Sequence, residues 1–406
     1  MRLSVLAVSN EATQHGYIRN LETFSGKMAG ICYMKDSYFD SYVSDDEKAR
    51  SRFDRVIRTG HHSISDHSFI TILFEDIPKM TAMILNSLGF YNTSEKSGRY
   101  TIMYSTGKNK ELYDKWYQIF YDRILEYDSN IDKTNTGEAS DLLRRKLAQE
   151  NARYMLSVFE PSVTMAYTTS LRMWSYIVCM CRDYLDTADH STEFNKKIYN
   201  CIYNLYLQLL LTNCFSDRII DNKSRKFNFL SNQTGYNIDK TEESVGVSYL
   251  IKYKTSFASL AQEQRHRTLE YFMCFDGSDT TKISFYVPRL LQTEANKKLS
   301  DEWLDDLSLI TETYPNAILV NTVEIGNISD FMLKCDERLC GRVMLETMEN
   351  VRNNLYKFVR APIKSEFMTK EIERHFRDGK VVMKCGNTVC KEPCYWGPIK
   401  SQNKLI

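Results

Sequence analysis

The strongest constraint on the fold is a plan that occurs twice along the chain, a strand-like run followed directly by a helix-like run. Residues 68–74, SFITILF, are rich in β-branched and aromatic side chains and predict a strand, and Pro78 then suits the start of a helix. Residues 247–264, VSYLIKYKTSFASLAQEQ, have the same order. The two halves therefore predict a tandem repeat of one α+β domain.

Amphipathic segments elsewhere predict long helices. In residues 110–127, KELYDKWYQIFYDRILEY, apolar side chains recur every three or four positions and so share one face of a helix. The segment 134–141 is expected to be a loop that ends in a helix cap. Further helices are expected over residues 142–158, 194–212, 300–312 and 340–358. We therefore expect each domain to be a mixed or antiparallel sheet packed with long helices.

A polar stretch without periodicity divides the chain. Residues 221–246 predict a linker or a long surface excursion. On this basis we expect one domain over residues 1–220, a second over 247–362, and a small cysteine-rich segment over 363–406.

Composition limits the classes of protein to consider. The chain has 406 residues, 43% of them hydrophobic and 26% charged, which is typical of globular proteins with two or three domains. The net charge of +1 gives no reason to expect direct contact with nucleic acid. No run is long enough to cross a bilayer, so no membrane partner is expected. Eleven cysteines without a secretory signal favour a reducing, cytoplasmic location.

Three adjacent residues, Arg265, His266 and Arg267, raise the question of function. Two guanidinium groups and an imidazole repel one another and are hard to bury, so their spacing alone predicts a solvated basic face. However, a Gln stands three residues before the triplet, and FYVP follows at residues 285–288. This arrangement resembles the flavin-dependent thymidylate synthase (ThyX) family, whose signature joins Arg-His-Arg to a downstream Glu, Ser and Arg.

The signature is divided between the two halves of this sequence. TSEKSGRY keeps Glu95, Ser97 and Arg99 at the family's spacing, but residues 87–89, where Arg-His-Arg would stand, are Ser-Leu-Gly. The second half keeps residues 265–267. Its three later positions hold Met273, Phe275 and Gly277. Because each half lacks what the other retains, we expect one composite site, as the resembled family builds its sites between subunits of a homotetramer.

Other positions follow the same resemblance over about residues 55–200 and 245–360. The first half offers GHHSISDH, in which Asp66 replaces the usual Glu, and ENARYML; TTSLRMW offers Arg172 only with a one-residue shift. In the second half Met344 replaces the usual Gln, next to Glu346. The resemblance implies catalytic roles for Arg99, His266 and Arg338. It implies nucleotide contacts from Glu95, Ser97, Gly98, Arg99, Arg153, Gln262, Arg265 and Arg338. It implies flavin contacts from His61, Ser63, Asp66, Arg265, His266, Arg267 and Asn327.

These residue types suit the implied ligands. A nucleotide phosphate is a dianion, and arginine offers it bidentate contacts that stay charged. The resemblance implies reductive methylation of dUMP, or a related pyrimidine nucleotide, at C5, with FAD as cofactor and NADPH and methylenetetrahydrofolate as co-substrates. No protein nucleophile is needed. Two fused chains would form a homodimer that imitates the family's tetramer.

Two other functions stay open. One is flavin-dependent C5 hydroxymethylation, or modification of another uridine nucleotide. The other is a nucleotide-binding or regulatory protein that has lost turnover.

Several of these residues also have simpler interpretations. Glu95 and Arg99 could form an i,i+4 ion pair on a helix. His61, His62 and His67 could bind a metal, although their spacing is not a usual ligand pattern. His190 and His375 are expected at the surface.

The cysteines near the C-terminus predict a separate feature. CGNTVCKEPC contains Cys385, Cys390 and Cys394, with Cys335 and Cys340 upstream. Four of these thiols could hold a structural zinc ion or an iron–sulfur cluster. The alternative is a small cap with free thiols.

Overall fold

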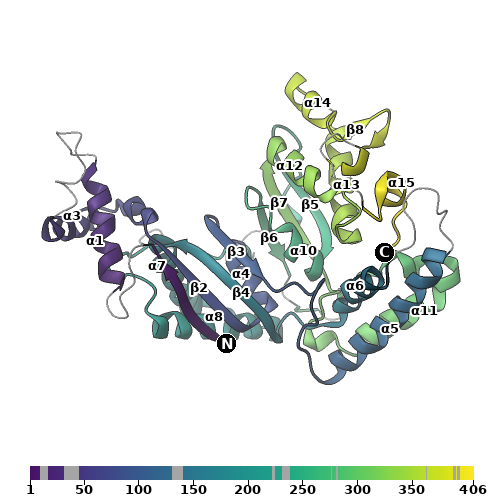
Figure 1. Cartoon of the computed structure of the whole chain (residues 1–406), viewed down its shortest axis with the longest axis horizontal. Coiled ribbons are helices and arrows are strands. Elements are labelled where there is room, and N and C mark those ends of the chain that lie inside the picture. The colour runs from purple at the N-terminus through teal and green to yellow at the C-terminus, as the bar shows by residue number, and fades with distance from the viewer. Residues whose placement is uncertain are drawn as a thin grey trace. The chain divides into compact units, whose positions relative to one another are not determined.

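The chain folds into two compact units, each of which is discontinuous in sequence. The first comprises residues 1–96 and 161–227, and the second comprises residues 97–160 and 228–406. Each unit has its own antiparallel sheet packed with helices, so the predicted α+β class is confirmed (Figure 1). The computed structural model describes residues 1–9, 17–31, 45–129, 140–221, 225–230, 238–275, 277–279, 282–362, 364–386, 390 and 394–406.

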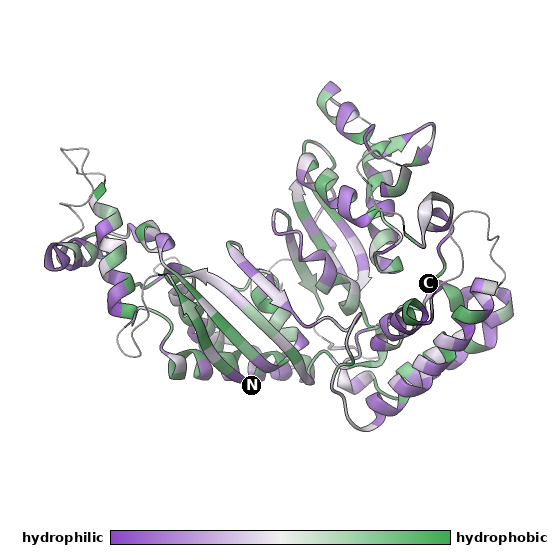
Figure 2. Ribbon diagram, in the orientation of Figure 1, coloured by the Kyte–Doolittle hydropathy of each residue, from purple (hydrophilic) through white to green (hydrophobic). Residues whose placement is uncertain are grey.

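The first unit is built on a four-stranded sheet with strand order β1-β2-β4-β3. Its strands are β1 (Arg2–Val8), β2 (Phe69–Pro78), β3 (Tyr91–Glu95) and β4 (Pro161–Ser170). Alternation along β2 buries Ile70, Ile72 and Phe74 completely, as the predicted strand requires. The ring of Phe74 stacks on Trp174, whose indole donates to the Ile70 carbonyl at 3.1 Å. Figure 2 shows the hydrophobic residues that run along the central strands.

Helices complete the first unit. Pro78 is the N-cap of α4, where its missing N–H is not needed. Ser170 and Thr192 cap α7 and α8 by accepting from the backbone N–H groups of Met173 and Asn195. The helices are α1 (Tyr17–Gly30), α3 (Asp46–Arg58), α4 (Lys79–Asn86), α7 (Leu171–Thr187) and α8 (Glu193–Thr212).

The second unit is built on a three-stranded sheet with strand order β5-β7-β6. Its strands are β5 (Ser248–Ser256), β6 (Glu270–Cys274) and β7 (Leu319–Asn327). The helices α10 (Phe257–Glu263), α12 (Ile328–Arg338) and α13 (Leu345–Arg360) pack against this sheet. The last of these helices begins at Leu345, whereas the sequence predicts a start at 340. Residues 340–344 instead form a loop at the site described below.

Three further helices of the second unit form a second core. They are α5 (Gly107–Ser129), α6 (Asp141–Ala152) and α11 (Lys297–Ser308). Trp116 of α5 packs edge to face against Trp303 of α11, with 4.7 Å between the ring centroids. The Trp116 indole N–H donates to the Asp306 carboxylate at 2.8 Å. The predicted cap of α6 is Ser140, which accepts from Leu143 N, while the loop expected before it lies outside the described residues. This helix ends at Ala152 rather than 158, because a single 3₁₀ turn follows it.

The C-terminal residues of the second unit add α14 (Glu366–Ile372), the hairpin of β8 (Phe376–Arg377) and β9 (Lys380–Val381), and α15 (Gly397–Gln402). Short 3₁₀ turns occur at His62–His67, Arg153–Met155, Ile238–Lys240, Arg289–Gln292, Glu294–Asn296, Thr311–Thr313 and Lys384–Gly386. Among the described residues, no helix is both long and apolar enough to cross a membrane.

The division into units differs in plan from the domains expected from the sequence. Residues 97–160 belong to the same unit as the C-terminal half. Within the expected linker 221–246, Phe227, Phe229 and Leu230 are buried, so this stretch is not a surface excursion throughout. The tandem arrangement and its boundaries stay a prediction.

Candidate functional site

The candidate site lies in the second unit and is organised around a buried ion pair. Arg99 follows the turn that leaves β3, and its Nε donates to the carboxylate of Glu150 on α6. Its Nη2 donates to the carbonyl oxygen of Arg342. Burial lowers the pKa of the Arg99 guanidinium, but Glu150 outweighs this effect and raises that pKa above its ordinary value. Arg99 is therefore a fixed positive charge at this site.

Two neighbours of Arg99 shape the turn. The backbone N–H of Arg99 donates to Ser97 Oγ at 3.3 Å. A Cβ on Gly98 would lie 3.2 Å from Met103 Cγ and 3.7 Å from Arg153 Cδ. Glycine therefore allows this backbone to lie close against the Met103 side chain.

Two hydrogen-bond donors and one hydroxyl oxygen converge on a single sulfur atom. Arg153 Nη2 contacts Met344 Sδ, and Gln262 Nε2 and the Tyr154 hydroxyl lie 3.7 and 3.6 Å from the same atom. A thioether is a weak acceptor. In addition, Arg153 Nε and Gln262 Oε1 are buried without a hydrogen-bond partner among the described residues. This set of donors fits an anionic oxygen better than it fits the methionine that it surrounds.

The Arg-His-Arg triplet forms the turn between α10 and β6. His266 is only 9% exposed, and its Nε2 accepts from Arg338 Nε at 2.7 Å. Burial, and then the charge of Arg338, lower the pKa of His266 to about 2. The imidazole is therefore neutral, which removes the expected repulsion within the triplet. Arg265 is half-buried and Arg267 is exposed, so the triplet is not simply a solvated basic face.

Arg338 also contacts the helix that precedes the triplet. Its Nη2 donates to the carbonyl oxygen of Gln262 at 3.4 Å, one turn before His266. Through Gln262 and Met344 this network continues to Arg153. The second unit thus brings together Arg99 and Arg153 from one half of the sequence and Gln262, His266 and Arg338 from the other.

A buried carboxyl group lies behind the sulfur. Glu346 accepts from Ser256 N at 2.7 Å, from Ser256 Oγ at 2.5 Å and from the Tyr154 hydroxyl at 2.7 Å. Burial raises the pKa of Glu346 to about 7. One of these hydrogen bonds holds the Tyr154 hydroxyl, which contacts the sulfur. Glu346 therefore fixes the position of Tyr154 in the site.

A second buried charged cluster, which the sequence analysis did not predict, lies next to α10. Lys334 is completely buried and donates to Glu263 at 2.7 Å and to Glu324 at 2.8 Å. The other oxygens of the two carboxylates accept from Asn350 at 3.0 Å and from the Tyr249 hydroxyl at 2.7 Å. All four carboxylate oxygens therefore have donors. A Glu inside the β-branched run of β7 is the one local signal of this cluster.

The sequence analysis also did not predict the contacts of Lys404 with the loop at residues 341–343. Lys404 is 1% exposed, and its Nζ donates to the carbonyl oxygens of Gly341 and Val343 at 3.0 and 2.6 Å. Burial lowers the pKa of Lys404 to about 8. A Cβ on Gly341 would lie 2.4 Å from Trp396, so the loop fits closely against the C-terminal residues. Together these contacts hold the loop that carries Met344.

The flavin-binding residues predicted in the first half lie in the other unit. His61 and Ser63 are exposed at the 3₁₀ turn before β2. Asp66 accepts from Ser170 Oγ at 2.7 Å and from Arg172 Nε at 2.9 Å. The shifted candidate Arg172 is thus the ion-pair partner of Asp66.

Two other predicted residues have structural contacts of their own. Glu95 ends strand β3 and pairs with Lys79. The i,i+4 helix pair of Glu95 with Arg99 is therefore wrong, because neither residue is helical. The side chain of Asn327 caps α12 by accepting from Asp330 N at 2.9 Å. The roles of Glu95 and Asn327 in ligand binding stay predictions.

The C-terminal thiols do not form a metal site in the described part of the chain, where no group of three or more His, Cys, Asp or Glu side chains is arranged to hold an ion. Burial raises the pKa of the Cys385 thiol, and the neighbouring Cys394, Cys340 and Cys390 raise it further. His375, expected at the surface, is 1% exposed and lies 3.0 Å from Asp336. That expectation is wrong because the acid offers the buried ring a partner.

Comparison with known proteins relates the first half of the chain to one sequence family. Residues 17–202 match the sequence model of the family described as thymidylate synthase complementing protein. A UMP/dUMP methylase, PolB, from Streptomyces cacaoi, solved with 5-Br dUMP, is 13% identical and has a TM-score of 0.32, with 52% of this chain and 90% of that chain covered. The flavin-dependent thymidylate synthase ThyX from Helicobacter pylori, solved with FAD and dUMP, is 12% identical and has a TM-score of 0.28, with 53% and 100% covered. No curated protein matches the chain.

Proposed function

We propose a function for this chain, whose residues 17–202 match the sequence model of the thymidylate synthase complementing protein family. The chain is a flavin-dependent methyltransferase that binds FAD and dUMP, or a related pyrimidine nucleotide. The reaction is reductive methylation at C5, with methylenetetrahydrofolate as carbon donor and NADPH as reductant. Two chains form a homodimer. The described cysteines are free thiols, which supports a reducing, cytoplasmic location.

The observation that carries this proposal is the convergence of two incomplete motifs in one unit. Arg99 and Arg153 come from the first half of the sequence, and Gln262, His266 and Arg338 come from the second. Neither half alone contains both sets. Their network within the second unit supports a composite site that forms inside a single chain.

The nucleotide phosphate would occupy the position now taken by the Met344 sulfur. A phosphate oxygen accepts hydrogen bonds far better than a thioether, and it can satisfy the buried Arg153 Nε as well. Arg99 adds a fixed positive charge next to it. The donors therefore favour an anion as soon as the methionine side chain moves aside.

The flavin supplies hydride chemistry when bound, and the residues of the chain supply binding and orientation. Arg265 and Arg267 stand on one turn and can reach a pyrophosphate. His266 is neutral and its Nε2 accepts from Arg338, so the ring hydrogen is on Nδ1, which can donate to a ligand. Arg338 holds that ring in place and keeps a positive charge where an oxyanion of the pyrimidine would develop.

The visible absorption spectrum tests this proposal. FAD is added to the purified protein, followed by dUMP, and the flavin band is recorded at each step. A flavin spectrum that changes on addition of dUMP supports a shared site, and turnover with NADPH and methylenetetrahydrofolate then tests the reaction. Protein that takes up no FAD would contradict the proposal.

One observation favours a second candidate, a nucleotide-binding protein without turnover. Arg99 is already paired with Glu150, and Met344 fills the centre of the donor set. Binding of dUMP without any reoxidation of reduced flavin in the presence of methylenetetrahydrofolate would select this candidate.

A further inference from the structure

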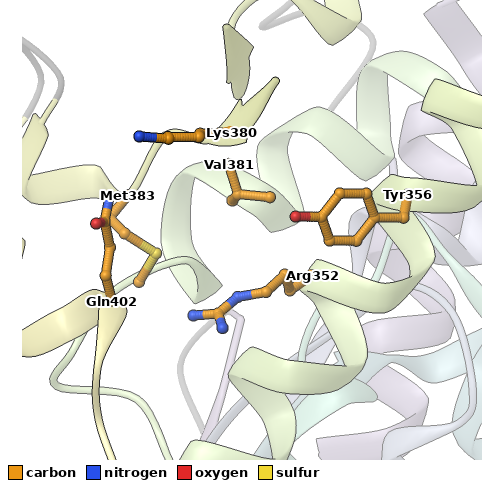
Figure 3. Close-up of a pocket in the computed structure, with 6 residues that line it drawn as sticks. All are labelled: Arg352, Tyr356, Lys380, Val381, Met383 and Gln402. Carbon is orange, nitrogen blue, oxygen red and sulfur yellow. The ribbon is translucent and has the colours of Figure 1, made fainter. Parts of the chain in front are cut away.

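We propose that a pocket between α13 and the β8–β9 hairpin binds a small oxyanion, a phosphate or carboxylate group on a short apolar stem. The pocket has a volume of about 160 Å³. It is lined by Arg352, Tyr356, Lys380, Val381, Met383 and Gln402 (Figure 3). None of these residues belongs to the nucleotide site proposed above.

Arg352 supplies the main argument. Its side chain lies one helical turn before Tyr356 on α13, and in Figure 3 the guanidinium and the Tyr356 hydroxyl both point into the gap. Arg352 Nε is buried without a hydrogen-bond partner among the described residues. The carboxylate of Glu349, on the same helix, is bonded instead to Arg289 at 2.7 Å. A buried guanidinium nitrogen without an acceptor is costly, and an oxyanion would supply that acceptor.

The hairpin adds a second positive charge in a fixed place. Lys380 begins β9 directly after a turn in which Asp378 and Gly379 have φ angles of 49° and 74°. Two successive positive φ angles at Asp-Gly are typical of a tight type I′ turn. The turn therefore holds Lys380 at the rim of the pocket that Arg352 enters.

The remaining walls limit the rest of the ligand. Val381 is 8% exposed and Met383 is 2% exposed, so this side of the pocket is apolar. A cavity of about 150 Å³ holds a benzene-sized molecule. The pocket therefore suits a charged group with a few carbon atoms and is too small for a whole nucleotide.

Calorimetric titration of the full chain tests the site, with inorganic phosphate and with L-glutamate as separate probes at constant salt. The stronger probe identifies the kind of oxyanion. For that probe we expect R352Q to weaken binding at least ten-fold and K380Q and Y356F to weaken it several-fold. K298Q, which removes an exposed charge from α11, should leave binding unchanged.

Two results would overturn the proposal: R352Q and Y356F that both bind the probe as the unmodified chain does, or no binding of either probe to the unmodified chain. Y356F removes a single hydroxyl, so it keeps the test valid even if R352Q folds poorly. The same variants should bind dUMP normally. Failure of this site is therefore distinguishable from failure of the proposed function, in which dUMP would not bind at all.

Discussion

The second unit contains two buried charge clusters that differ in how completely they are satisfied. In the Lys334 cluster every carboxylate oxygen of Glu263 and Glu324 has a donor. Around Arg99 and Arg153, by contrast, Glu150 Oε1, Arg153 Nε and Gln262 Oε1 are buried without a partner among the described residues. A network in which every polar group is paired stabilises the fold, whereas buried polar groups without partners require an explanation, such as the bound ligand proposed above.

The largest expected effect is on the closed cluster. Lys334→Met would leave two buried carboxylates without their cation. We expect the free energy of unfolding, measured in urea, to fall by about 3–5 kcal/mol. Lys298→Met, at an exposed position of α11, is the matched control and should change little. A loss below about 1 kcal/mol for Lys334→Met would show that the Lys334 cluster contributes little to the stability of the fold.

A second test measures how stability depends on pH through the buried carboxyl group of Glu346. The folded pKa of Glu346 is about 7, above its ordinary value of 4.5. Its contribution to stability is therefore fully present below pH 4.5 and is lost as the pH rises through 7. Glu346→Gln keeps an acceptor for Ser256 N and cannot ionise.

We therefore expect the free energy of unfolding to differ less between pH 5 and pH 8 for Glu346→Gln than for the unmodified chain. The two changes should differ by on the order of 3 kcal/mol. Identical pH profiles for the two proteins would mean that Glu346 is already ionised in the fold.

The third test addresses the open cluster. Arg153→Gln removes the guanidinium that faces the sulfur but leaves the Arg99–Glu150 pair in place. We expect dUMP to bind about 100-fold more weakly, since a charge-assisted contact to phosphate is lost. Arg145→Gln, at an exposed position of the preceding helix α6, is the control. Equal losses for the two variants would indicate a general charge effect.

The smallest effect concerns the sulfur itself. Met344→Gln places an amide oxygen within reach of the Arg153 and Gln262 donors, whereas Met344→Leu removes even the weak acceptor. We expect the Gln variant to be about 1 kcal/mol more stable than the Leu variant in urea unfolding. The reverse order would show that the apolar packing of this side chain outweighs its polar surroundings.

The sequence predicted the local elements and the members of the motif better than their partners. The strand at 68–74 and the amphipathic helix at 110–127 follow from periodicity, and both are present. Arg153 and Gln262 could be singled out because they resemble positions of a known motif. Glu150, Lys334 and Lys404 could not, because their partners lie far away along the chain and a single charged residue in an apolar pattern has no periodic signal.

The division into units could not be predicted from the sequence for a similar reason. The helix that contains Trp116 was recognised, but its partner Trp303 lies in the other half of the sequence. Only tertiary packing assigns residues 97–160 to the second unit. His375 shows the same effect on a smaller scale, since its burial depends on Asp336 of α12.

The brace from Lys404 to the Val343 carbonyl spans 61 residues of sequence. During synthesis on the ribosome, the loop that carries Met344 emerges well before the lysine that holds it. A nascent chain can therefore fold its sheet and bury Lys334 while the donor set around the sulfur is still unformed. Affinity for the nucleotide should then arise last, after the scaffold is already stable.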